Sequence, residues 1–304
     1  MNYQAEKCLP ISVSEKNDGG LTYIEIENIK GFSAAKTFDC GQCFRFEAVG
    51  RTEHETEISG VAFGRFISIA QDGEKLRIYN CDRDFFEEKL YSYLGLCDDY
   101  DEIRRNIAHR CPTEYMLSVM ECGEGIRILR QEKWEALCSF IISQNNNIPR
   151  IKKIIRALSE KCGDEVDASL MRGHGAAERE FAFPTAEAVM ALGVEGLREL
   201  RVGFRAGYIF DAASKVVSGE IDLERISALA SEDCISALTA IKGVGLKVAS
   251  CTALFGMEKF DSFPIDVWIR RVLNEKFPED FDPVTLGEYA GIAQQYMFYA
   301  ARFD

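Results

Sequence analysis

The chain has 304 residues, of which 47% are hydrophobic and 28% charged, a composition typical of a soluble globular protein with two or three modest domains. No apolar run is long enough to span a membrane and the first residues do not resemble a secretory leader, so we expect a cytoplasmic protein. The formal net charge of −13 disfavours a polyanionic partner, unless basic residues gather locally as they do over residues 144–158.

Residues 21–80 predict a small antiparallel sheet. Apolar and polar residues alternate over 21–28, a second strand is expected over 43–48, and residues 57–70 have the period and glycine breaks of a hairpin. Asp72-Gly73 then predicts a tight turn into a strand over 75–80.

From Asp84 onward the hydrophobic period is helical. The expected helices cover residues 84–94, 101–110, 113–122 and 132–144. Later residues lack convincing strands, and the glycine-containing loop 162–177 is expected to be a flexible insertion. We therefore predict an α+β fold, with an antiparallel sheet domain and flanking helices over 1–118 and an all-α domain over 119–304.

The eleven cysteines form no disulfide framework, which favours reduced and mostly buried thiols. Cys40–Cys43 is the one CxxC motif. Such a motif can bind zinc or act as a redox pair, or its cysteines can simply be structural. No second CxxC exists, and only His54, His109 and His174 could complete a metal site. We expect no cofactor.

The most informative stretch covers residues 235–270. Apolar residues at helical spacing lead to Gly243-Val244-Gly245, and helical spacing then resumes, which predicts two helices joined by a tight hairpin. Glycines allow backbone conformations that turn main-chain N–H groups outward at the start of the second helix. Such a hairpin is suited to binding a phosphate group.

Lys247 falls in the first turn of that second helix, where the positive end of the helix favours a neutral, nucleophilic amine. Pro264-Ile265-Asp266 predicts the start of another helix, with the Asp266 carboxylate at its N-terminus. Taken singly, these features also fit an ordinary turn, a solvated lysine and a plain helix cap. In combination they resemble the lysine-bearing, bifunctional members of the helix-hairpin-helix DNA glycosylase superfamily.

Further stretches narrow the resemblance. Residues 125–151, 200–208 and 289–298 are similar to the 8-oxoguanine DNA glycosylases in the same order and at similar spacing, and residues 40–46 resemble the N-terminal domain of that family. The resemblance implies a monomeric base-excision repair enzyme that acts on double-stranded DNA containing 8-oxoguanine opposite cytosine. It implies Lys247 as the nucleophile that forms a Schiff base at C1′ and leads to β-elimination, and Asp266 as the group that stabilises the positive sugar.

The resemblance also implies a base pocket. The Gly41 carbonyl would accept the N7 hydrogen that only the oxidised base has, Gln294 would bind the Watson–Crick edge, and Phe298 and Cys251 would lie on the two faces of the base. From the residues alone, Cys251 is equally well explained as a small core residue, and the favoured interpretation is that Gln294 is an exposed helix residue and Phe298 a core aromatic.

The same resemblance implies four residues that manage the orphaned cytosine. Asn145, Arg150 and Arg205 would fill the gap and bind the cytosine, and Phe204 would act as a wedge. Arginine forks suit the two acceptors of cytosine. The alternative is that residues 145–147 cap a helix starting near Ile148 and that the arginines contact phosphates. The hairpin glycines Gly243 and Gly245 would face the DNA backbone, and the carbonyls of Thr239, Ile241 and Val244 could hold a monovalent or calcium ion.

Two positions depart from the family pattern: Trp268 stands where a histidine is common, and Phe255 replaces a pocket methionine. Three other functions fit parts of this pattern. An iron–sulfur glycosylase is excluded because no cysteine follows Cys251. A glycosylase without the lysine is disfavoured by Lys247, and a non-catalytic DNA-binding hairpin would need neither Lys247 nor Asp266.

Overall fold

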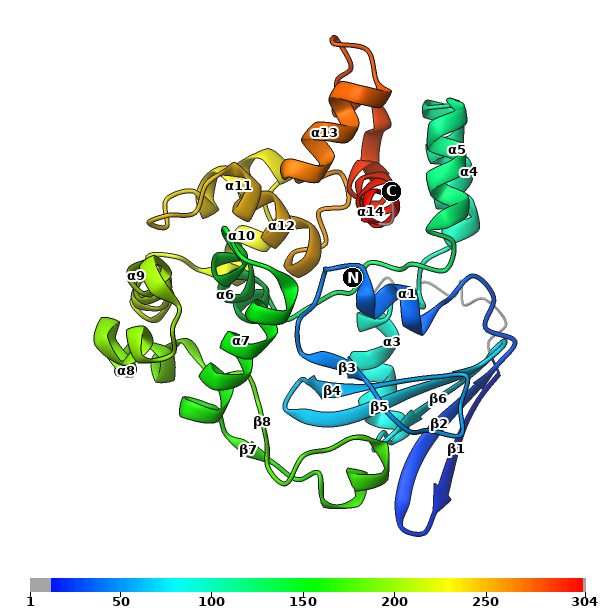
Figure 1. The fold of residues 1–304 in the computed structure, drawn as a ribbon, viewed down its shortest axis with the longest axis vertical. Helices are drawn as coiled ribbons and strands as arrows, with labels where there is room; N and C mark the ends of the chain where they lie inside the picture. The colour runs from blue at the N-terminus through cyan, green and yellow to red at the C-terminus, as the bar shows by residue number, and fades with distance from the viewer. Residues whose placement is uncertain (1–11, 303–304) are drawn as a thin grey trace, which may run out of the picture.

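The computed structural model describes residues 12–302, which form a six-stranded antiparallel sheet at one end and a large group of helices at the other (Figure 1). The strand order is β1-β2-β6-β5-β4-β3. The strands are β1 (Ser12–Asp18), β2 (Leu21–Glu27), β3 (Phe46–Ala48), β4 (Thr56–Ala62), β5 (Arg65–Asp72) and β6 (Lys75–Tyr79). The predicted sheet is confirmed, and β1 is an additional edge strand.

Buried isoleucines hold the sheet together. Ile24 and Ile26 of β2 and Ile67 and Ile69 of β5 are fully buried at alternate positions, which place them on one face of the sheet. They pack against the helical segment that follows the sheet, in the same buried cluster as its Phe86. That segment runs through α2 (Arg83–Phe85), a π-helical turn (Phe86–Leu90) and α3 (Tyr91–Tyr93).

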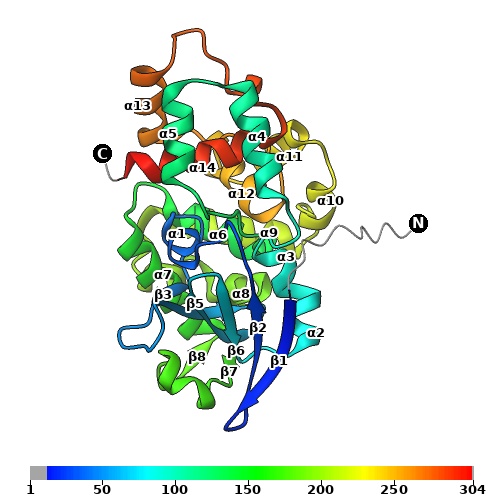
Figure 2. The same ribbon diagram turned by 90° about the vertical axis from the view of Figure 1, so that its right-hand side faces the viewer.

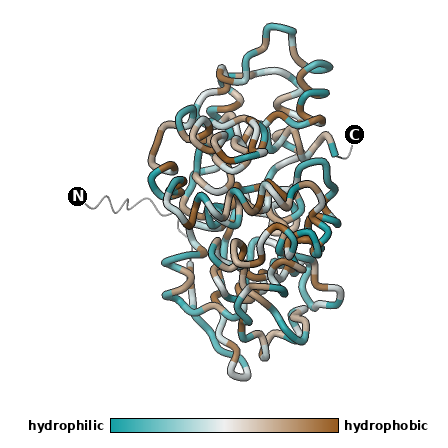
Figure 3. The backbone as a smooth tube through the Cα atoms, turned by 90° about the vertical axis from the view of Figure 1, so that its left-hand side faces the viewer, coloured by the Kyte–Doolittle hydropathy of each residue, from teal (hydrophilic) through white to brown (hydrophobic). Residues whose placement is uncertain are grey.

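The remaining helices are α1 (Ala34–Asp39), α4 (Tyr100–Arg110), α5 (Glu114–Cys122), α6 (Lys133–Ser143), α7 (Ile148–Cys162), α8 (Ala186–Glu199), α9 (Ala206–Val217), α10 (Leu223–Ser227), α11 (Ser231–Leu238), α12 (Leu246–Gly256), α13 (Val267–Lys276) and α14 (Ala290–Ala301), with short 3-10 turns at Ser169–His174, Gly203–Arg205 and Pro283–Tyr289. The helices expected over 101–110, 113–122 and 132–144 are confirmed as α4, α5 and α6, whereas α1 lies within the stretch predicted to form strands. Hydrophobic and hydrophilic residues intermingle along most of the chain (Figure 3), as amphipathic elements require. None of the helices within residues 12–302 has the length and hydrophobicity needed to cross a lipid bilayer.

Helices α4 and α5 lie beside α14, away from the sheet (Figure 2). Their buried residues, such as Ile107 and Met116, belong to the same hydrophobic cluster as the C-terminal helices. The predicted domain boundary between residues 118 and 119 falls inside α5. The core of the sheet is instead contributed by residues 24–96, together with Leu129.

The segment after α7 packs on the sheet, so the prediction of a flexible insertion there is wrong. Two short strands, β7 (Glu165–Val166) and β8 (Glu180–Phe181), pair with each other in this segment. Met171 is fully buried against Val61 and Phe66. The ring of His174 stacks on Tyr79, with 4.1 Å between centroids.

A buried carboxylate anchors this segment. Glu57 of β4 is 4% exposed, and its Oε1 lies 2.6 Å from His174 Nδ1 and accepts a 2.7 Å hydrogen bond from Ser68. Thr52 donates to the other oxygen. Burial opposes the charge of Glu57, but these hydrogen bonds outweigh it and lower its pKa from 4.5 to about 2.

We expect the free energy of unfolding of Glu57→Gln to fall less steeply at acidic pH than that of the wild type. Because the folded pKa of Glu57 lies below its unfolded value, the stabilisation is complete above pH 4.5 and is lost as the pH falls towards 2. At about 1.4 kcal/mol per pKa unit, this contribution is at most about 3.5 kcal/mol. Urea unfolding at several pH values between 7 and 2 measures it.

Glu160→Gln is the matched control, because its carboxylate pairs with Arg156 on an exposed face of α7. The wild type and the control should lose stability along the same curve in acid, and Glu57→Gln should lose less. Three parallel curves would contradict the role given to Glu57.

Candidate active site

The hairpin between α11 and α12 has the predicted form. Gly243 has φ +77°, and a Cβ atom added there would lie 2.3 Å from the ring of Tyr208, so only glycine fits. A Cβ at Gly245 would meet nothing within 4 Å, and Gly245 is the N-cap of α12. The hairpin therefore packs on α9 through Gly243 and leaves Gly245 open to a ligand.

A small pocket joins α12 to residues from both ends of the chain. Its volume is about 50 Å³, and it is lined by Gly41, Phe140, Lys247, Cys251, Phe255, Pro264, Asp266, Gln294, Gln295 and Phe298. The two proposed catalytic residues and the four proposed base-binding residues are all in this list. The structure thus brings together six residues that span positions 41 to 298.

Lys247 is half-buried in the first turn of α12. Its Nζ lies 5.8 Å from the centroid of the Phe140 ring, within cation–π range. One turn further along α12, burial raises the pKa of the Cys251 thiol, and the positive charge of neighbouring Lys247 partly opposes that rise. The amine is held against the pocket wall and the thiol stays protonated.

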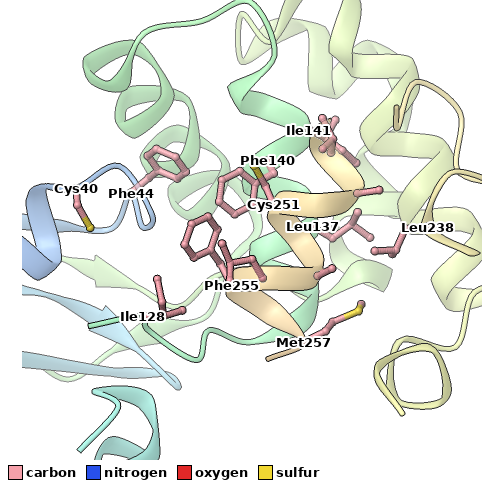
Figure 4. Close-up of a cluster of buried hydrophobic side chains, with 14 of the residues drawn as sticks. Cys40, Phe44, Ile128, Leu137, Phe140, Ile141, Leu238, Cys251, Phe255 and Met257 are labelled. Atoms are coloured by element: carbon pink, nitrogen blue, oxygen red, sulfur yellow. The ribbon is translucent and has the colours of Figure 1, made fainter. Parts of the chain in front are cut away.

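Aromatic rings form the floor beneath Cys251. Phe140 of α6 and Phe255 of α12 stack with 5.3 Å between centroids, and Phe44 meets Phe140 edge-on at 5.9 Å. Figure 4 shows Phe140 and Phe255 beside Cys251, with Phe44 approaching from the N-terminal segment. This dry surface strengthens any electrostatic interaction made above it.

Asp266 is the N-cap of α13, as predicted. Its Oδ1 accepts a hydrogen bond of 2.9 Å from the backbone N–H of Ile269. The cap orients the carboxylate, which shares the pocket with Lys247. A fixed negative charge beside an amine can stabilise a cation that forms between them.

Gln294 is the clearest sign that the pocket binds something. Its side chain is 4% exposed, and Oε1 has no hydrogen-bond partner among the described residues. Leaving a buried acceptor unpaired costs about 1–3 kcal/mol, so the amide is explained if a ligand supplies the missing donor. Phe298, one turn along α14, covers Gly41: a Cβ there would lie 3.1 Å from its ring.

Three glutamines around Gly41 were not identified from the sequence. Gln295 donates to the Cys40 carbonyl at 2.7 Å. Gln42 and Gln131 are also buried, and Gln131 donates to the Gln42 carbonyl at 2.7 Å. The available signal was the polar pair Gln294-Gln295 inside an apolar helix, where only one of the two side chains can face a given ligand.

The residues predicted to meet the orphaned base lie near one another, with different exposure. Asn145 is exposed with φ +45°, and Arg150 is exposed with its Nη2 3.3 Å from the Arg201 carbonyl. Phe204 is 55% exposed, as a wedge residue must be. Asn147 caps α7 by accepting from Arg150 N at 3.0 Å, so the predicted helix cap is confirmed.

Arg205, which is predicted to contact the orphaned base, is only 2% exposed. Its guanidinium donates to the carbonyls of Gln144 at 2.7 Å, Asn145 at 3.0 Å and Val202 at 3.0 Å. In this conformation the arginine holds the turn that presents Asn145. Burial and the nearby charge of Arg150 lower its pKa.

Comparison with known proteins agrees with this geometry. Residues 24–137 match the family model described as "8-oxoguanine DNA glycosylase, N-terminal domain", and residues 138–282 match "HhH-GPD superfamily base excision DNA repair protein". MBOgg1, solved with a low-affinity DNA ligand, has a TM-score of 0.87 and 35% identity, covering 97% of this chain and 99% of that one. The chain belongs to the 8-oxoguanine DNA glycosylase family.

Two further proteins are similar to this chain. The Clostridium acetobutylicum 8-oxoguanine glycosylase/lyase, solved with dsDNA containing cytosine opposite 8-oxoG, has a TM-score of 0.85 and 34% identity, covering 96% of this chain and 98% of that one. The N-glycosylase/DNA lyase of Saccharomyces cerevisiae is 36% identical over 165 residues, which are 51% of this chain and 42% of the yeast protein. The chain therefore matches less than half the length of that curated relative.

This family member presents apolar side chains around its lysine. Leu246 is 72% exposed, Val267 77% and Trp268 42%. They flank Lys247 and Asp266 in sequence, so exposed apolar side chains stand next to both proposed catalytic residues along the chain. Exposed apolar residues gathered in this way are typical of a binding surface.

Metal and redox chemistry have little support in the described residues. No group of three or more His, Cys, Asp or Glu side chains among residues 12–302 is placed to hold a metal. Burial raises the pKa of Cys40 to about 12 and that of Cys43 further, which disfavours the thiolates that zinc or disulfide exchange requires. The backbone ion site at Thr239, Ile241 and Val244 stays a prediction.

Proposed function

We propose that this chain excises 8-oxoguanine from duplex DNA, opposite cytosine, through a Schiff base on Lys247 and then cleaves the strand by β-elimination. The observation that supports this most strongly is the shared pocket, in which an amine, a carboxylate and an unpaired buried amide face the same small volume. We place this activity in the cytoplasm, where a bacterial chain would meet the nucleoid.

The chemistry follows from the amine. The Lys247 nitrogen attacks C1′ of the flipped nucleotide, the bond to the base breaks, and the base leaves with the electron pair. The C1′–O4′ bond of the sugar then breaks, O4′ takes one of the two protons of the Lys247 amine, and an iminium remains between Nζ and C1′, which acidifies the C2′ protons. Loss of one such proton expels the 3′ phosphate, and water then releases Lys247 from the cleaved strand.

Asp266 and the hairpin supply the electrostatics. The Asp266 carboxylate stabilises positive charge on the sugar as the base departs. The open Gly245 at the start of α12 lies where the backbone N–H groups of a helix N-terminus attract a phosphate. Together they hold the sugar between Lys247 and the DNA backbone.

Base recognition is assigned to the two ends of the chain. The unpaired Oε1 of Gln294 accepts hydrogen from the Watson–Crick edge, and Phe298 stacks on the ring. At about 50 Å³ the pocket is smaller than the ~300 Å³ or more of typical ligand sites. Phe298 must therefore move away from Gly41 when a purine enters.

Arg150→Ala should relax the preference for cytosine opposite the lesion. Arg150 is the exposed arginine of the pair, and a forked donor to cytosine O2 and N3 contributes about 1–3 kcal/mol of discrimination. The preference is the single-turnover rate of excision opposite cytosine divided by the rate opposite each of the other three bases. We expect this ratio to fall roughly 10-fold or more. Arg205→Ala, which frees the Asn145 turn, should slow excision opposite all four bases alike.

The comparison separates two assignments. Arg205→Ala could instead relax the preference as much as Arg150→Ala. Arg205 would then break its hydrogen bonds to the backbone carbonyls when DNA binds and contact the orphaned base directly, as the family resemblance implies. If neither change affects the preference, cytosine is read elsewhere.

A panel of duplexes tests the proposed function. Wild-type chain is incubated with duplexes that contain 8-oxoguanine, guanine, hypoxanthine, 3-methyladenine or an abasic site opposite cytosine, and strand cleavage is followed. We expect cleavage of the 8-oxoguanine and abasic duplexes only. Cleavage of another modified base in preference to 8-oxoguanine would replace the proposed substrate, and no cleavage of any duplex would leave a DNA-binding protein.

A further inference from the structure

The Gly41 carbonyl belongs to a peptide group whose two neighbours are both held by buried glutamines. Gly41 has φ +77°, which favours glycine, and a Cβ atom added there would lie in tight contact with the Phe298 ring, at 3.1 Å. The peptide that precedes it carries the Cys40 carbonyl, and the peptide that follows it carries the Gln42 carbonyl. Each of these carbonyls accepts a hydrogen bond from a glutamine side chain.

Gln295 holds the preceding peptide. It is 2% exposed on α14, and its Nε2 donates to the Cys40 carbonyl at 2.7 Å, across 255 positions of the chain. It directly follows Gln294, so the two side chains leave the helix about 100° apart. Both side chains line the pocket, but Gln294 keeps an unpaired Oε1 there, whereas the Nε2 of Gln295 is engaged by the Cys40 carbonyl.

Gln42 and Gln131 hold the following peptide. Gln131 Nε2 donates to the Gln42 carbonyl at 2.7 Å. The Gln42 side chain is fully buried and donates to the carbonyls of Thr37 and Arg127, both at 2.8 Å, while it accepts from Leu129 N at 2.8 Å. The loop is thereby tied to α1, to the strand-like segment before α6 and to α14.

We infer that Gln295 is a positioning residue that fixes the Gly41 carbonyl and so determines how well the pocket distinguishes 8-oxoguanine from guanine, an inference that rests on the proposed function. A carbonyl held still reads the N7 position strictly: it accepts from the N7 hydrogen of 8-oxoguanine and repels the N7 lone pair of guanine. A carbonyl free to rotate would turn away from guanine and lose that repulsion.

Gln295→Met tests this role, because methionine has a similar length and lacks the donor. Two quantities are compared with the wild type: single-turnover excision of 8-oxoguanine, and cleavage of a pre-formed abasic site, which has no base to read. We expect excision to slow about 10-fold and abasic cleavage to stay within about 2-fold. The ratio of Kd values for guanine and 8-oxoguanine duplexes, measured by fluorescence anisotropy, should also fall about 10-fold.

Two further variants complete the design. Gln131→Met loosens the loop from its other side and should give the same pattern, which keeps the inference testable if Gln295→Met does not fold. Gln71→Met is the matched control: its Nε2 donates to the Phe32 carbonyl at 2.8 Å, outside the pocket. It should leave both activities and the Kd ratio unchanged.

The outcomes separate this inference from the proposed function. Equal losses of excision and abasic cleavage in Gln295→Met would show a structural role only, and unchanged values would show that Gly41 needs no such support. Either result overturns the inference while the wild type still cleaves 8-oxoguanine. A wild type that cleaves abasic sites but no 8-oxoguanine instead overturns the proposed substrate.

Discussion

Borohydride should attach the wild-type chain covalently to a duplex that contains 8-oxoguanine opposite cytosine, and Lys247→Gln should abolish this attachment. Reduction traps the iminium that the lysine amine forms with C1′. The glutamine amide is not nucleophilic, so strand cleavage should fall by roughly 10⁴-fold or more. Denaturing electrophoresis separates the trapped complex from free protein and DNA.

Lesion binding should survive in Lys247→Gln, because the groups that read the base lie on α14 and in the Gly41 loop. Anisotropy with the same duplex checks this. Lys242→Gln is the control: this lysine is exposed in the same hairpin, outside the pocket. It should trap like the wild type, and trapping that persists in Lys247→Gln would move the nucleophile to another amine.

Asp266→Asn should slow base excision by about 10²- to 10³-fold while the fold keeps its stability. A pre-oriented charge in a water-poor pocket contributes several kcal/mol to a transition state that carries the opposite charge. Asparagine retains the cap of α13, because Asn and Asp are equivalent there to within a few tenths of a kcal/mol. Single-turnover kinetics and urea unfolding measure the two effects separately.

Asp266→Ala completes this comparison. It removes the charge and the hydrogen bond to Ile269 N, so it should lose the same activity and about 1 kcal/mol of stability. If Asp266→Asn excises 8-oxoguanine at the wild-type rate, Asp266 is only a helix cap. The carboxylate that stabilises the sugar would then be sought elsewhere.

Much of the fold was predictable because periodicity is a local signal. The helix expected over 101–110 runs from Tyr100 to Arg110, and that expected over 113–122 is α5. The edge strand β1 escaped because Ser12–Asp18 is largely exposed and lacks an apolar alternation. The segment around His174 was misjudged because its anchor, Glu57, lies 117 positions earlier in the chain.

The residues of the candidate site likewise differ in how well the sequence alone could predict them. Lys247 and Asp266 were identified from short motifs with a physical reason at each position, and Gln294 and Phe298 from family resemblance alone. The exposure of Arg205 could not be foreseen, since it depends on carbonyls in the turn at 144–145 that lie about 60 positions away. The roles of Gln295 and Gln131 likewise exist only once distant segments meet.

The composite pocket has a consequence for the newly made chain. Lys247 and Asp266 lie within twenty residues of each other, whereas the walls that select a base come from Gly41 near one terminus and Phe298 near the other. In an incompletely folded molecule these walls are missing, so the proposed nucleophile has no bound base to displace. Under the proposed function, copies that have not finished folding therefore pose little threat to intact DNA.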